Sequence, residues 1–219
     1  MKFEIEGNPD YGQLTVDLAA GETIAAEGGA MAWMSDGMQM NSRLLGGLGR
    51  ALIRKCFGGE SLFVGEYEHP AGGRVVFSPS SPGSVCHRAL QGDTFILTAG
   101  SFLACSPGID LKTRFGGLKA LFSGEGAFVL ECRGTGDLFF NAYGAVCERQ
   151  VDGSLTVDTG HVVAWEPSLS YTIGGMGSLK STLFSGEGLV MKFTGTGTIW
   201  LQTRTMGGLA GWLTPFCRG

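Results

Sequence analysis

GGLKALFSGEGAFVLECRGTGDLFFNAYG, residues 116–144, decides the fold prediction because most of its pattern occurs a second time. Residues 176–204 read MGSLKSTLFSGEGLVMKFTGTGTIWLQTR and share with it LK, LFSGEG, an alternating apolar run, GTG and a second apolar run. A fainter copy, GGLGRALIRKCFGGESLF, begins at Gly46. Such recurrence predicts a structural unit that the chain uses more than once.

The segments upstream of these copies also recur. Leu14–Met34, Arg88–Cys105 and Leu155–Tyr171 each read as a short strand, a glycine turn and an apolar strand. The chain is therefore predicted to be a single compact domain of three internal repeats, at about 1–80, 81–148 and 149–219, each roughly 60–70 residues long. We expect an all-β fold made of three fused β-sandwich-like repeats.

Within a repeat, the residue pattern is that of strands. AFVLEC and LVMKF alternate apolar and polar residues and are rich in branched and aromatic side chains. Gly-Thr-Gly between two such runs predicts a hairpin connection. We expect two packed antiparallel sheets in each repeat. Arg43–Phe57 is the single segment with a helical pattern, and its glycines argue against a long helix.

LFSGEG could be a catalytic motif or a structural turn. In the fainter copy the serine is replaced by Gly58, while the following Gly-Glu persists. A catalytic serine would not vary between copies that keep the turn. The repeat pattern therefore favours a structural role for LFSGEG.

Composition limits the function classes. The chain has 219 residues, a net charge of −4 and 16% charged residues, fewer than in an average globular protein. The acidic balance argues against a nucleic-acid-coating protein, and low charge with 43% hydrophobic residues suits oligomerisation. The start, MKFEIEGNPD, reads as a strand rather than a signal peptide, and no uncharged run is long enough to span a bilayer. We expect a cytoplasmic protein without a transmembrane segment.

No standard catalytic or cofactor motif is present. The sequence lacks GxSxG, GxGxxG and the P-loop pattern, and its three histidines have no zinc-site spacing. Glu66–His69, EYEH, is predicted to be a solvated strand edge rather than a metal site. The six cysteines are far apart, and most are predicted to be buried thiols. We therefore predict a non-enzymatic protein without a cofactor or metal.

One segment is locally basic and apolar. Its cations are Arg43, Arg50, Arg54 and Lys55, interleaved with leucines. They could bind an anionic ligand, such as a phosphate or a lipid headgroup. Alternatively, the leucines pack in a core and the cations are solvated, an interpretation favoured by the similar Arg–Gly-Gly-Leu patterns after Arg114 and Arg204. The uncharged tail MGGLAGWLTPFC is a second candidate for an exposed patch, or it packs on a neighbouring subunit.

GGLGRALIRKCFGGESLF, LFSGEG and the terminal MGGLAGWLTPF together resemble the altered-inheritance-of-mitochondria (mitochondrial biogenesis) family of unknown-function proteins. The resemblance covers nearly the whole chain. It implies a fold similar to the tryptophan RNA-binding attenuation protein, with three such units fused in one chain and assembly as a homotrimer. It implies no catalytic residue. The attenuation protein's function is not implied, because the repeats share no pattern of basic residues beyond Arg43, Arg114 and Arg204.

Overall fold

The structure is a computed structural model and describes residues 1–44, 63–115, 128–175 and 189–217. These residues form a mostly β protein with two antiparallel sheets and one short C-terminal helix. One sheet has four strands in the order β1-β2-β7-β4. The other has eleven, with the path β12-β15-β13-β8-β11-β9-β3-β6-β5, while β10 pairs with β11 and β14 with β15.

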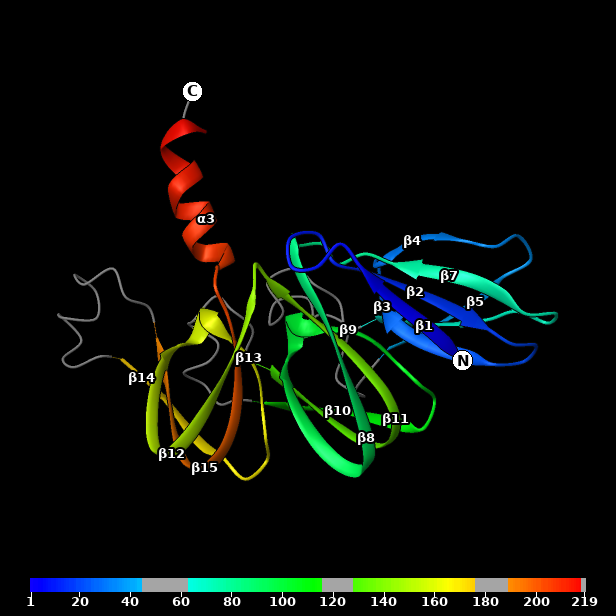
Figure 1. The fold of residues 1–219 in the computed structure, drawn as a ribbon. Helices are drawn as coiled ribbons and strands as arrows, with labels where there is room; N and C mark the ends of the chain where they lie inside the picture. Colours follow the sequence, from blue (N-terminus) through cyan, green and yellow to red (C-terminus); the bar gives the residue numbers. More distant parts are fainter. Residues whose placement is uncertain (45–62, 116–127, 176–188, 218–219) are drawn as a thin grey trace.

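Figure 1 shows the strands in groups that lie side by side in a row. The first group consists of β1 Lys2–Glu6, β2 Gln13–Leu18, β3 Thr23–Glu27, β4 Met31–Met34, β5 Gln39–Leu44, β6 Phe63–Glu68 and β7 Gly73–Phe77. The middle group consists of β8 Gly83–Thr98, η1 Ala99–Ser101, β9 Phe102–Cys105, β10 Ile109–Phe115 and β11 Phe128–Tyr143. The last group consists of β12 Val146–Asp158, η3 Thr159–His161, β13 Val162–Trp165, β14 Ser170–Gly174 and β15 Val190–Gln202, followed by α3 Met206–Leu213 and η4 Thr214–Phe216.

Long antiparallel ribbons form the middle and last groups. β8 pairs with β11 over almost its whole length, and β12 pairs with β15 from Val146 to Asp158. Both ribbons bend sharply at the bottom of the view in Figure 1. The division of the chain into three repeats remains a prediction.

Gly-Thr-Gly does not form the predicted hairpin. Residues 134–136 lie inside β11, and residues 195–197 lie inside β15. Gly134 has φ +142°, and a Cβ there would collide with the carbonyl oxygen of Gly108. Glycine therefore allows the strand to bend without leaving its ladder, which a hairpin prediction from the motif does not consider.

Three further expectations change. The described residues form two sheets in total, one of which passes through all the groups, rather than two sheets in each repeat. Arg43 and Leu44, the start of the segment with a helical pattern, belong to strand β5, and the rest of that segment lies outside the described residues. The helix that the structure describes is instead α3, within the tail MGGLAGWLTPFC.

Buried side chains form three apolar clusters along the row. The first contains Leu14, Ile24 and Phe77, the middle one Phe95 and Leu130, and the last Trp165, Phe193 and Ile199 among other residues. The largest side chains in these clusters are almost completely inaccessible to water. Each of the three groups of strands therefore has its own apolar core, to which the neighbouring group contributes some residues.

Candidate functional site

Neighbouring groups are joined edge to edge by antiparallel strand pairs. β3 of the first group pairs with β9 of the middle group, with Ala26 opposite Ala104. β8 of the middle group pairs in the same way with β13 of the last group, with Leu97 opposite Ala164. Backbone ladders of this kind leave no unpaired strand edge at the joint.

β4 occupies in the first group the place that β9 and β13 occupy in theirs. Each of these short strands pairs within its own group with a register that skips one residue: Met31/Trp33 against β7, Phe102/Ala104 against β11 and Val162/Ala164 against β15. Their burial differs. All four residues of β9 and of β13 are buried, whereas all four residues of β4 are exposed.

Large apolar side chains make up most of this exposed strand. Met31 is 37% exposed, Trp33 50% and Met34 38%. β4 is the end strand of the four-stranded sheet, so its outer edge has no strand partner among the described residues. An apolar edge strand without a strand partner is a surface on which another strand can pair.

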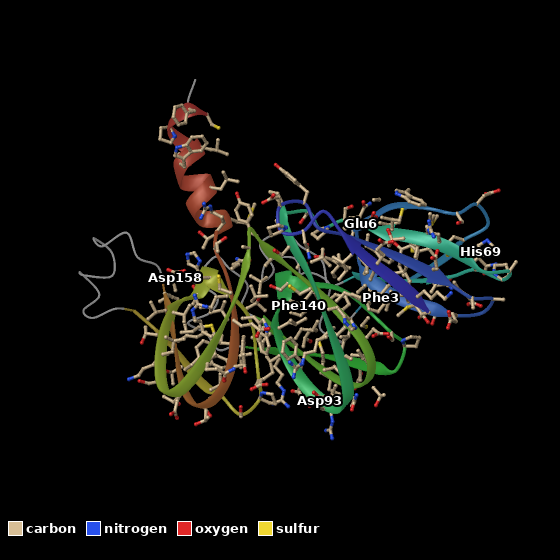
Figure 2. The ribbon with its side chains drawn as sticks, in the orientation of Figure 1. Phe3, Glu6, His69, Asp93, Phe140 and Asp158 are labelled. Atoms are coloured by element: carbon tan, nitrogen blue, oxygen red, sulfur yellow. The ribbon has the colours of Figure 1, made fainter. Side chains whose placement is uncertain are left out.

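A groove of about 550 Å³ lies at the opposite end of the row. β12, η3 and β15 form it, and its lining is Cys147, Arg149, Gln150, Leu155, Thr156, Val157, Asp158, His161, Leu201 and Gln202. Leu155 and Leu201 are half-buried and pack against the last apolar cluster. Figure 2 shows Asp158 in the last group and His69 at the far end of the first group.

Polar groups at the mouth of the groove are bonded to the protein itself. His161 donates from Nδ1 to the carbonyl oxygen of Gln202 at 2.6 Å, because a carbonyl can only accept. The Gln202 amide donates to the carbonyl oxygen of Gly160 at 2.7 Å, and Asp158 accepts from the Gly160 N–H at 2.8 Å. These bonds occupy the polar groups around η3, while Leu155, Val157 and Leu201 supply the aliphatic part of the lining.

Two of the cysteines that the structure describes, Cys86 and Cys132, do not have the character of nucleophiles. None of the five described cysteines forms a disulfide. Cys105 and Cys132 are buried, but Cys86 and Cys147 are half-buried and Cys217 is exposed, so the prediction that most are buried holds for two of the five. Burial, with a contribution from Glu148, raises the pKa of the Cys86 thiol to about 11. Burial raises the pKa of Cys132 further still. A thiol with a raised pKa carries little reactive thiolate at neutral pH.

The predicted anion-binding residues are not brought together as a described site. Arg43 lies in β5 opposite Val64, and its side chain is not described. Arg50, Arg54 and Lys55 lie outside the described residues, as do both copies of LFSGEG. The anionic-ligand role of this segment remains a prediction.

Glu66–His69 is not the strand edge that the sequence suggests. β6 runs between β3 and β5 and pairs with both, and Tyr67 is buried against Phe77. His69 follows this strand and bonds through Nε2 to the carbonyl oxygen of Asp36 at 2.9 Å. Within the described ranges, no cluster of His, Cys, Asp and Glu side chains could hold a metal ion.

α3 carries the exposed part of the uncharged tail. It projects away from the strands at the top of Figure 1, and none of its residues is buried. Trp212 and Phe216 are 66% and 74% exposed and lie with their ring centroids 5.6 Å apart. In the part of the chain that the structure describes, no helix has the length and apolar character needed to cross a membrane.

Comparison with known proteins places this architecture in a family. The sequence profile described as Mitochondrial biogenesis AIM24 matches residues 3–204. The chain belongs to the AIM24 family. One similar protein is an uncharacterized protein of Streptococcus pyogenes serotype M6. It is 30% identical to this chain over 225 residues, which cover 99% of this chain and 91% of that protein.

A solved structure has a similar overall fold. The X-ray crystal structure of a Streptococcus pyogenes protein superposes with a TM-score of 0.82 at 28% identity, covering 98% of this chain and 99% of that one. The family has no established biochemical function in these comparisons. Membership therefore confirms the family that the sequence resembles, while its likeness to the tryptophan RNA-binding attenuation protein remains a prediction.

Sequence reasoning missed the exposed edge of β4 and the groove of β12. The signal was present in the upstream segments GAMAWM, GSFLACS and GHVVAWE, which begin at Gly29, Gly100 and Gly160. They align as the three short strands of the row. The burial of the three strands differs, because β9 and β13 are buried whereas β4 is exposed.

Proposed function

We propose that the protein is a non-enzymatic, ring-forming scaffold or interaction protein of the cytoplasm that assembles as a homotrimer. Three fused units in one chain, each with a fold similar to the tryptophan RNA-binding attenuation protein, would supply the repeating wall of such a ring. The matching register of β4, β9 and β13 supports this division into units.

The observation that carries the proposal is the exposure of β4. β9 and β13 are buried because each joins its own group to the preceding one. β4 begins the row and has no preceding group, so its apolar residues face solvent. A closed ring of identical chains covers such an edge without leaving another one open.

A non-enzymatic role accords with the chemistry of the described residues. Cys86 and Cys132 have raised pKa values, and the His161 ring is hydrogen-bonded to the backbone. The exposed surfaces with distinct character are apolar: β4 and the uncharged α3. Such surfaces suit contacts with protein chains more than turnover of a substrate.

Native mass spectrometry of the purified full chain tests the proposal. We expect a species with three times the chain mass of 23.0 kDa and no bound small molecule. A protein that stays monomeric over the micromolar range contradicts the ring. Extra mass that is lost on denaturation would instead indicate a ligand-binding protein.

A further inference from the structure

We propose that the groove at β12 receives β4 of a second copy of this chain, with Trp33 of that copy seated in it. This inference rests on the proposed self-assembly and names the two surfaces that would make it. The contact is head to tail: the last group of one chain meets the first group of the next.

The two internal joints fix the register of this contact. In both, the end of a strand of one group lies opposite the short strand of the next group: Ala26 of β3 is opposite Ala104 of β9, and Leu97 of β8 is opposite Ala164 of β13. Val157 of β12 occupies the position of Leu97, since Val157 pairs with Met191 on β15 as Leu97 pairs with Leu130 on β11. Continuing the pattern places Val157 opposite the next copy's Trp33.

The apolar clusters give a second, independent argument. The first cluster is completed by Leu103, Ala104 and Phe139 from the middle group. The middle cluster is completed in the same way by Val163, Ala164 and Trp200 from the last group. No following group of this chain completes the last cluster among the described residues. Its half-buried Leu155 and Leu201 line the groove instead.

Side-chain size explains why Trp33 fits there. At each internal joint an alanine lies across from an aromatic residue of its own group: Ala104 from Phe139, and Ala164 from Trp200. These aromatic rings are buried against the preceding group. In the first group the sizes are exchanged, because Trp33 lies across from Val76. The one aromatic ring of this pair is thus on β4, where it is half exposed.

An arginine supports the same assignment. Arg88 of β8 lies opposite Leu138 and places its guanidinium 4.6 Å from the ring centroid of Phe95 and 5.4 Å from that of Trp200, across the joint. Arg149 of β12 holds the corresponding position opposite Ile199 and lines the groove. It is placed to stack on an aromatic ring that arrives from the next chain.

A second copy is the occupant that these observations favour. The groove and β4 lie at opposite ends of one row, so a single chain cannot bring them together (Figure 1). Both belong to a type of joint that the chain already makes twice. A contact between two different surfaces of identical chains closes into a ring when the rotation allows it.

Cysteine cross-linking tests the register. The pairing of Ile96 with Trp165 predicts that Thr156 lies opposite Met34 of the next copy. Residues directly opposite in an antiparallel pair have Cβ atoms about 4.5–5.5 Å apart, close to the span of a disulfide. We would co-express Met34→Cys with Thr156→Cys, with Cys147→Ser and Cys217→Ser in every chain to remove the native thiol of the groove and the exposed one, and oxidise the full-length protein. Met34→Cys with Ser154→Cys is the matched control, because that residue is two positions away on β12.

We expect a covalent dimer from the Met34→Cys and Thr156→Cys mixture, at least about tenfold more than from the control mixture or from either variant alone. Equal linking in Met34→Cys alone would mean that β4 edges meet each other, and would overturn the inference. Absence of the dimer in a chain that still forms a trimer would overturn the inference and leave the proposed ring standing.

Trp33→Ser provides the second measurement. Both variants of this test change exposed side chains, so each is expected to fold, which circular dichroism checks. Trp33→Ser should lower the association constant by about tenfold or more, as truncation of a central aromatic residue does in interfaces. Met40→Ser, on the edge strand β5 with a similarly exposed side chain, should leave it unchanged. Equal association of Trp33→Ser and wild type would refute the role of Trp33, whereas a monomeric wild type would refute the proposed ring itself.

Discussion

Gly134→Ala should destabilise the protein strongly, although it adds a single methyl group. Gly134 lies at the bend of β11, with φ +142°, opposite Ile109 of β10. An added Cβ would collide with the carbonyl oxygen of Gly108, which also accepts a hydrogen bond from the Thr135 N–H at 3.1 Å. The collision is with backbone, so no side-chain rotation can relieve it.

The structure allows the cost to be estimated from its parts. A non-glycine residue in this backbone region costs about 1–3 kcal/mol. Displacing the Gly108 carbonyl adds roughly 1 kcal/mol for the weakened hydrogen bond to Thr135. The total of about 3 kcal/mol is a large fraction of the roughly 5–15 kcal/mol that stabilises a typical protein.

Gly153→Ala is the matched control. Gly153 also has positive φ, +95°, in the middle of a ribbon strand, but an added Cβ meets no atom within 4 Å. Its cost is therefore the same backbone contribution alone, about 2 kcal/mol.

Urea unfolding followed by tryptophan fluorescence, at one protein concentration for all variants, measures the difference. With a typical urea dependence of about 2 kcal/mol per M, the difference of about 1 kcal/mol between the two variants separates their midpoints by about 0.5 M. Coincident midpoints for Gly134→Ala and Gly153→Ala would refute the collision argument. They would mean that the Gly108 turn moves aside without cost.

Three other predictions test separate features of the fold. Trp165 is fully buried in the last cluster, and its Nε1–H lacks a partner among the described residues. Trp165→Ala should lower the unfolding free energy by about 3–5 kcal/mol. Trp165→Phe should cost much less, because it also removes the unpaired donor, and urea denaturation compares the two variants. The hydrogen bonds from Arg74 lower the pKa of Asp17. This carboxylate therefore stabilises the fold above its unfolded pKa and loses that effect as pH falls through the folded value. Asp17→Asn should reduce the drop in melting temperature between pH 5 and about pH 3, by a small amount because both side chains are about half exposed, and an unchanged drop would argue against the pair. Alkylation of the native protein at neutral pH should modify the exposed Cys217 first and Cys132 last, because burial raises the pKa of Cys132 and shields it; early labelling of Cys132 in a mass-spectrometric time course would contradict this.

The alternating apolar runs were sufficient to predict the β class. In β11, Leu130 and Cys132 are buried whereas their neighbours Val129 and Glu131 are only half-buried, which is the alternation that the sequence pattern predicts. The length of this strand could not be predicted in the same way. Glycine ends strands in most sequences, and only the close approach of Gly108 to Gly134 explains why this one bends and continues.

The candidate surfaces were less accessible to sequence reasoning. The basic segment containing Arg50 and Arg54 drew attention because its charge stands out in an acidic chain, and charge can be read without a structure. Trp33 did not, because an apolar residue in a strand pattern is expected to be buried. Its exposure follows from its position in the row, which depends on long-range pairing that no local pattern specifies. The helix α3 was hidden for a similar reason, since its glycines lower helix propensity.

Differences between the three joints give the proposed ring its specificity. If all units were alike, any unit could pair with any other, and chains could join in several registers or grow without closing. In the middle and last groups the aromatic residue of this pair, Phe139 or Trp200, lies on the ribbon strand. In the first group it is Trp33, which lies on the short strand β4. A groove lined by Leu155 and Leu201 that accepts the bulky Trp33 is poorly filled by a strand with alanine at that position. The exchange of small and large residues thus directs the end of one chain to the start of another, and leaves the two internal joints to form within the chain.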